Sequence, residues 1–95
     1  MSDFNHLINT QTFTDFKQFF TAKNLENKLI SFYHLNRNYE TMGYQYKGYI
    51  KQIIQNENPI LGIHITHMND MPCDERIEYI PLDRIRLYIK KSDIT

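Results

Sequence analysis

The fold is decided by Tyr44-Gln-Tyr-Lys-Gly-Tyr-Ile-Lys-Gln-Ile-Ile54, read together with Arg76-Ile-Glu-Tyr-Ile-Pro-Leu-Asp-Arg-Ile-Arg-Leu-Tyr88 further along the chain. Both stretches are rich in β-branched and aromatic residues, the types that are enriched in β-strands. Gly48 interrupts the first stretch, which is long for a flat strand, and predicts a bend or bulge there. The segment from 81 to 84, Pro-Leu-Asp-Arg, divides the second stretch and predicts one tight turn between two short strands.

The rest of the chain extends this pattern to a mainly β fold with one N-terminal helix. The strands are expected at residues 28–35, 44–55, 60–66, 76–80 and 85–89. Residues 67–75 carry turn-forming and acidic residues and predict an exposed loop. A bent second strand and a one-turn connection before the last strand are typical of small barrels. The predicted fold is therefore a small, five-stranded, partly open barrel of the Src-homology-3-like or Sm-like type.

A short helix is expected near the N-terminus. Phe13, Phe16 and Phe20 follow the spacing of one apolar helix face. Thr12 is the predicted N-cap, and the helix should end near Asn24. We expect this helix to cover one mouth or one face of the barrel.

Length and composition describe one small domain. The 95 residues divide into a helical segment (1–27), the barrel (28–90) and a polar tail (91–95). The 11 basic and 11 acidic residues cancel, which disfavours a protein that holds nucleic acid by charge alone. No apolar run is long enough for a membrane span, and no secretion signal is visible. The single cysteine, Cys73, suits a reducing compartment, so a cytoplasmic location is expected.

The residues that could carry catalysis or bind a metal do not form a recognisable motif. His64, His67, Asp70 and Cys73 lie close together in sequence, but their spacing matches no established zinc pattern. Cys73 lacks the glycine-rich or helix-N-terminal setting that activates a thiol, and is interpreted as an ordinary loop residue. The three glycines are isolated, so no phosphate-binding loop is present. The sequence therefore predicts neither an enzyme, nor a metal site, nor a cofactor.

Basic residues and tyrosines alternate along two of the predicted strands. Ile85, Leu87 and Ile89 should share the inner face of the last strand, which leaves its basic and aromatic residues outside. The candidate binding residues are Lys47, Tyr49, Lys51, Arg84, Arg86, Tyr88 and Lys90. Such a face can bind a protein, track phosphates and stack on bases, or simply be a solvated surface.

Three segments of the chain resemble the YolD-like family of low-GC Gram-positive bacteria and their phages. They are the aliphatic-aromatic strand at 29–35, the Lys-Gly-Tyr-Ile-Lys-Gln-Ile strand from Lys47, and the Ile-Pro-Leu-Asp-Arg-Ile segment from Ile80. The resemblance covers about residues 28–89. The N-terminal segment and the stretch from Met68 to Asp74 depart from the family pattern. The resemblance implies a small accessory protein that acts beside DNA-repair or translesion polymerases and is often carried on mobile elements.

Three functions follow as expectations. The first is a non-enzymatic adaptor that binds a DNA-processing protein through the basic and aromatic face. The second is direct binding of single-stranded nucleic acid, and the third is inhibition of a host protein by a phage or mobile element. The sequence leaves the oligomeric state open, although exposed edges of a partly open barrel allow pairing by strand addition.

Overall fold

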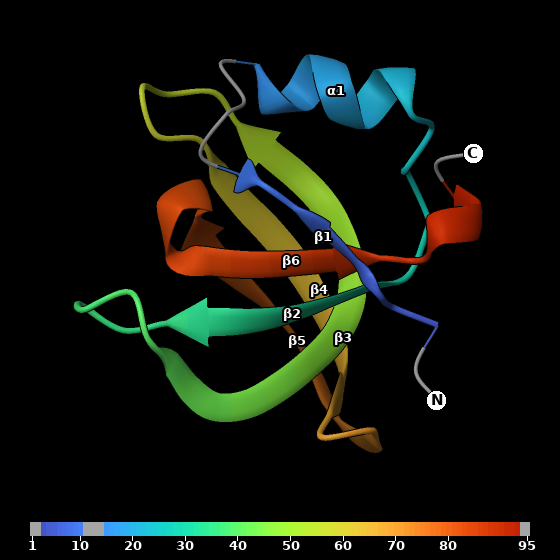
Figure 1. Cartoon of the computed structure of the whole chain (residues 1–95), viewed down its shortest axis with the longest axis vertical. Helices are drawn as coiled ribbons and strands as arrows, with labels where there is room; N and C mark the ends of the chain where they lie inside the picture. The colour runs from blue at the N-terminus through green and yellow to red at the C-terminus, as the bar shows by residue number, and fades with distance from the viewer. Residues whose placement is uncertain (1–2, 11–14, 94–95) are drawn as a thin grey trace.

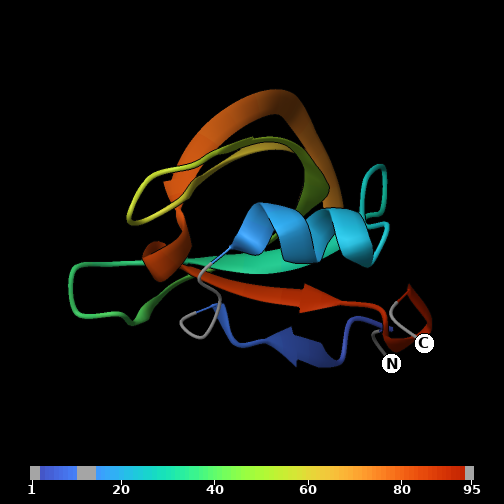
Figure 2. The same cartoon turned by 90° about the horizontal axis from the view of Figure 1, so that it is seen from above.

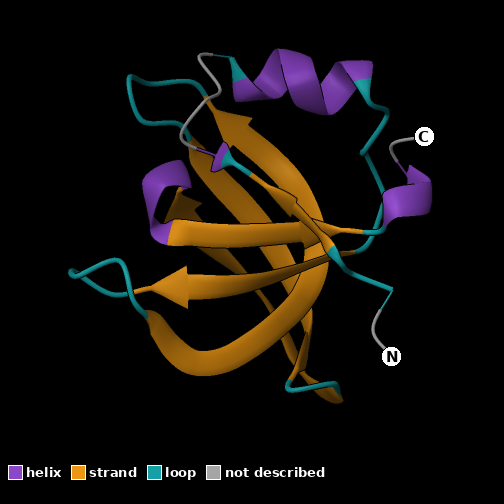
Figure 3. Ribbon diagram, in the orientation of Figure 1, coloured by secondary structure: helices purple, strands orange, loops and turns teal. Residues whose placement is uncertain are grey.

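One antiparallel sheet dominates the computed structural model, which describes residues 3–10 and 15–93 (Figures 1 and 3). The elements, in chain order, are β1 (His6–Ile8), α1 (Phe16–Ala22), β2 (Ile30–Leu35), β3 (Thr41–Ile54), β4 (Ile60–Met68), β5 (Met71–Pro81), the 3₁₀ turn η2 (Leu82–Arg84), β6 (Ile85–Ile89) and the 3₁₀ turn η3 (Lys91–Asp93). The predicted class, mainly β with one helix, is confirmed.

The sheet has six strands in the order β1-β6-β2-β3-β4-β5 and does not close on itself. It rolls over so that β5 and β1, the two edge strands, lie on opposite sides of the molecule (Figure 2). The predicted five-stranded barrel is not confirmed, because β1 adds a sixth strand beside β6. β1 pairs His6 with Ile89 and Ile8 with Leu87, within the segment 1–27 that was expected to be helical. A three-residue strand is too short to show the alternation that identifies strands in a sequence.

The bend predicted at Gly48 is present in β3. The register between β3 and β4 shifts between Lys47 and Gly48, which marks a bulge. A Cβ atom at Gly48 would lie 2.2 Å from the carbonyl oxygen of His64, so the two backbones approach too closely for any other residue. The first half of β3 pairs with β2 and the second half with β4, so this one strand passes from one layer to the other.

The core lies between the two layers of the rolled sheet. Ile30 and Phe32 from β2 are fully buried, and so is Ser31 between them. The inward-facing positions of the other strands are also buried: Ile50, Leu61, Ile63, Ile65, Ile80, Ile85, Leu87 and Ile89. The inner side predicted for the strand at 85–89 is therefore confirmed.

The helix α1 covers one end of this core. Phe16 and Phe20 are buried against the strands, together with Leu25 just beyond the helix. The N-cap is Asp15, whose carboxylate accepts a hydrogen bond from the Gln18 amide at 2.9 Å. The predicted N-cap, Thr12, and the predicted helical residue Phe13 lie outside the described residues. The chain leaves the helix with Asn24 at φ 54°, which agrees with the predicted end.

The loop predicted at residues 67–75 is wrong. β4 and β5 continue through this region as a long hairpin, joined by a two-residue turn at Asn69 and Asp70. Both turn residues have positive φ, 52° and 63°, as two-residue hairpin turns require. Pro72 is tolerated because β5 is an edge strand. Cys73 is accordingly not a loop residue: it lies in β5 and packs, partly buried, against the core.

The tight turn predicted at 81–84 is confirmed as η2, with Leu82 buried beneath it. The predicted polar tail instead begins with the 3₁₀ turn η3. Asp93 in η3 lies 3.9 Å from the Lys28 ammonium.

Candidate functional site

The structure divides the predicted basic and aromatic face among three places. The sequence treated β3 and β6 as one surface, whereas β2 lies between them in the sheet. The bend at Gly48 separates the residues of β3 further, since the strand changes its pairing partner there.

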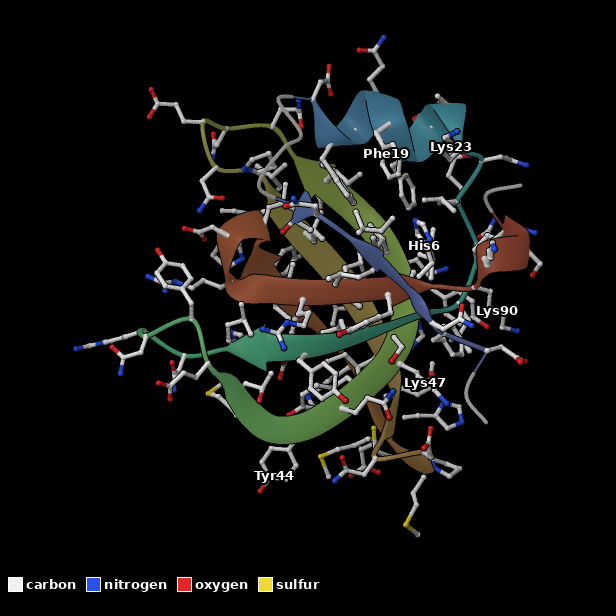
Figure 4. The ribbon with its side chains drawn as sticks, in the orientation of Figure 1. His6, Phe19, Lys23, Tyr44, Lys47 and Lys90 are labelled. Carbon is white, nitrogen blue, oxygen red and sulfur yellow. The ribbon has the colours of Figure 1, made fainter. Side chains whose placement is uncertain are left out.

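The first place is a covered cluster around Phe4. The ammonium groups of Lys47 and Lys90 lie 5.2 Å and 5.3 Å from the centre of the Phe4 ring. Both lysines lie on the same side of the molecule (Figure 4). Tyr88 lies on β6, two residues before Lys90, in register with Ser31 of β2, which is itself in register with Lys47. Lys47 also forms an ion pair with Asp70, so this positive charge already has a partner.

The second place lies beyond the bend, on the second half of β3. The Lys51 ammonium is 5.5 Å from the centre of the Tyr49 ring. Lys51 also lines a shallow hollow of about 270 Å³ between β3 and α1, beside Lys17 and Glu26. These residues form a local contact and do not continue the cluster around Phe4.

The third place is the loop that joins β2 to β3, where Arg84 braces the chain. Its guanidinium donates hydrogen bonds to the carbonyl oxygens of Asn36 and Arg37, both at 3.2 Å. The same group lies 4.3 Å from the centre of the Tyr39 ring, which is within cation–π range. The Asn36 side chain adds two hydrogen bonds inside the loop, from the amides of Asn38 and Glu40. The loop is therefore held in one shape by contacts from η2, which lies far along the chain.

A groove of about 340 Å³ lies beside this braced loop. Its lining comes from β1, β6, the end of β2 and the loop: Leu7, Ile8, Asn9, Thr10, Leu35, Tyr39, Ile85 and Arg86. Leu7 is 51% exposed and Tyr39 is 49% exposed, so large apolar surface faces solvent on both sides of the groove. Arg86 was predicted as a binding residue, whereas Tyr39 and Leu7 were not. Tyr39 lies in a polar turn segment and Leu7 in a three-residue strand, so neither carried a sequence pattern.

The geometry of this groove suits an apolar side chain next to an acidic group. Leucine and isoleucine side chains supply the apolar lining, and Arg86 is exposed beside them. Tyrosine and arginine contribute much of the binding energy at protein interfaces, because they combine a large contact area with hydrogen bonds. A braced loop also loses little conformational entropy when a ligand binds.

A second polar cluster lies on the inner face of β5. Arg76 donates a hydrogen bond to Glu78 at 2.8 Å, and its guanidinium carbon is 5.9 Å from the centre of the Tyr46 ring. The hydrogen bond with Glu78 raises the pKa of Arg76. Burial raises the pKa of the Tyr46 hydroxyl, and the charge of Glu78 adds to this rise.

The residues first considered as metal ligands are dispersed along the β4–β5 hairpin. His64 lies 3.6 Å from Glu75, while the His67 ring shares a 2.8 Å hydrogen bond with the Thr66 hydroxyl. Within residues 3–10 and 15–93, no three histidine, cysteine or acidic side chains gather in a group that could hold a metal ion. In the same ranges, no helix has the length and apolar character needed to cross a bilayer.

In comparisons with known proteins, no family model, no curated protein and no solved structure matches the chain.

Proposed function

We propose that the protein is a non-enzymatic adaptor that binds another protein through the groove between β1, β6 and the β2–β3 loop. The observation that carries this proposal is the position of Tyr39. Its ring is half exposed, and the Arg84 guanidinium packs against it at 4.3 Å from the ring centre. An exposed aromatic side chain that is fixed in position beside an apolar groove is a typical anchor for a protein partner.

Strands β2 to β6 would then form a binding module of the small Src-homology-3-like or Sm-like barrel type. The order β6-β2-β3-β4-β5 supports this, as do the bend in β3 and the single turn of η2 before the last strand. β1 would be an addition to this module, and it contributes Leu7 and Ile8 to the groove.

The chemistry of the groove favours a segment with an apolar side chain next to a carboxylate. The apolar side chain would enter between Leu35 and Ile85, and the carboxylate would meet Arg86. The resemblance to YolD-like proteins indicates which partner to test first, a DNA-processing enzyme such as a repair polymerase. A cytoplasmic location is part of the same proposal.

Binding to a purified candidate polymerase, measured by calorimetry, tests the proposal. Tyr39→Ala and Arg86→Glu should each weaken the complex by at least about tenfold, because each removes one anchor of the groove. Lys23→Glu makes the same change of charge at an exposed position beside α1 and should leave the affinity unchanged. An affinity that is the same in all three variants would show that the groove is not the interface.

Direct binding of single-stranded DNA is the main competing function. The divided basic surface weighs against it, since Lys47 is paired with Asp70 and the remaining basic residues lie in separate places. Binding of an oligonucleotide that weakens steeply with salt would support this alternative and contradict the adaptor role. No binding at low salt would leave the adaptor role as the better account.

A further inference from the structure

The free edge of β5 is the longest unpaired strand edge in the described part of the chain. β5 ends the strand order and runs for eleven residues, so one side of its backbone has no neighbouring strand. Such an edge is a template for another strand. Pro72 and Pro81 lack an N–H group and mark the two ends of this stretch, in which residues 73–75 bulge and residues 76–80 continue the regular pairing with β4.

The side chains of this stretch differ between its two faces. Ile77 and Tyr79 point outward and are 54% and 56% exposed. Arg76 and Glu78 point to the inner face, where they lie opposite the buried Ile65 and Ile63 of β4. Arg76 and Glu78 bind each other along the strand at 2.8 Å and stay partly exposed, so an approaching strand meets a positive and a negative charge side by side.

We propose that this edge pairs with the same edge of a second copy of the chain, in antiparallel register about a two-fold axis at Ile77. In that register Arg76 lies opposite Glu78 of the second copy, and Glu78 lies opposite Arg76 of the second copy. Ile77 meets its own equivalent on the outer face, and Tyr79 meets Glu75. The paired strands join two six-stranded sheets into one continuous sheet.

The charge pattern selects this register over its neighbours. A two-fold axis perpendicular to the sheet keeps each side chain on its own face, and residues opposite each other in an antiparallel pair share a face. The axis must therefore lie between the two copies of one residue, which names the register. An axis at Arg76 places arginine opposite arginine, and axes at Glu75 or Glu78 place glutamate opposite glutamate. An axis at Tyr79 leaves the charges unmatched and brings Pro81 into the paired stretch. The axis at Ile77 alone combines the longest pairing with matched charges.

A second copy therefore fits the edge better than an unrelated strand does. Each copy supplies one arginine and one glutamate at the positions that the other copy needs, so the interface is self-complementary. These charges lie beside Tyr46, and the pairing would join the Arg76–Glu78 ion pairs of the two copies into one group of four alternating charges.

Sedimentation equilibrium of the full chain over a range of concentrations tests the proposal. The wild-type chain should reach a dimer, and Arg76→Glu or Glu78→Arg should each weaken the dimer by at least about tenfold, because each places like charges opposite one another twice. The double exchange of both residues should restore dimerisation. Arg37→Glu, at an exposed arginine of the β2–β3 loop, controls for the change in net charge.

A disulfide test measures the register itself. In a Cys73→Ser background, Ile77→Cys should cross-link to its own equivalent under mild oxidation, since directly opposite side chains lie close enough for a disulfide. Tyr79→Cys lies opposite Glu75 in the proposed register and should cross-link far less. Equal cross-linking at both positions would overturn the register.

Other outcomes overturn the proposal as a whole. A wild-type chain that stays monomeric at concentrations on the order of 1 mM has no such interface. A dimer that survives both single charge reversals pairs through another surface. The groove of the proposed adaptor function lies at the other edge of the sheet, so Arg86→Glu should abolish partner binding and keep the dimer. The two proposals can therefore fail independently.

Discussion

Single residues decide how the sheet rolls, and Gly48 is the clearest example. The sequence predicted a bend at Gly48 because one glycine interrupted an otherwise regular strand. The structure adds the reason that no other residue fits, namely the approach of the His64 carbonyl. The prediction succeeded because the absence of a side chain is visible in a sequence.

Gly48→Ala should destabilise the fold by more than about 2 kcal/mol, because its Cβ would overlap backbone atoms that cannot turn away. Gly43→Ala is the matched comparison: the space there is open, and only the φ of 84° opposes a side chain. That strain should cost about 1 kcal/mol. Urea denaturation measures both values. Equal losses would mean that the close approach at Gly48 does not matter.

The partly buried hydroxyl of Tyr46 makes stability depend on alkaline pH. Because its pKa is raised in the folded chain, the native state keeps this proton to a higher pH than the unfolded state does. Stability should therefore be fully present below the unfolded value of about 10 and fall as pH rises through the folded value. Tyr46→Phe should show a shallower fall, measured by urea denaturation over this range. An identical fall in the variant would contradict this assignment.

At the scale of elements, the β4–β5 hairpin shows where sequence reasoning failed. Residues 67–75 were predicted to be one exposed loop because of their turn-forming and acidic residues, Asn69 and Asp70 among them. Most of β5 is exposed because it is an edge strand, so its composition resembles that of a loop. The alternation of Arg76, Ile77, Glu78 and Tyr79 shows only that two faces differ, and both faces of this strand are partly solvated.

Asn69 contributes to the stability of this hairpin in two ways that can be measured separately. The Asn69 side chain accepts a hydrogen bond from the Gln45 amide at 3.0 Å, and its φ is positive. Asn69→Ala loses the hydrogen bond and adds backbone strain, so it should destabilise by about 2 kcal/mol. Asn69→Gly loses only the hydrogen bond, so it should destabilise by about 1 kcal/mol. Thermal or urea unfolding of both variants measures the difference, and a more stable alanine variant would refute the role of φ.

At the scale of the whole molecule, α1 and the sheet share one core. A helix of seven residues is not stable alone, so α1 depends on the burial of Phe16 and Phe20. We expect one cooperative unfolding transition for the chain. In hydrogen exchange, the Leu25 amide, which bonds the Phe20 carbonyl at 3.1 Å, should approach the protection of the core strands as denaturant is added. Persistent fast exchange at Leu25 alone would show that α1 unfolds separately.

The candidate site was harder to predict than the core, because it depends on how the strands pair across the whole sheet. Burial follows from the alternation within one strand, which is why Ile85, Leu87 and Ile89 were assigned correctly. A surface site depends on which strands become neighbours. Arg84 reaches Tyr39 only because β6 pairs with β2, and that pairing leaves no local pattern in the sequence.

The pairing of β1 with β6 has a mechanical consequence. His6, at the start of β1, lies opposite Ile89, at the end of β6. Tension applied between the flanking residues 5 and 90 would act first on the hydrogen bonds of this pair and then on those of the next, so the two strands would unzip. Hydrogen bonds that break one after another resist far less force than bonds that share a load. A chain held at these two points should release β1 under a small pull, while the ladders among β2, β3, β4 and β5 stay intact.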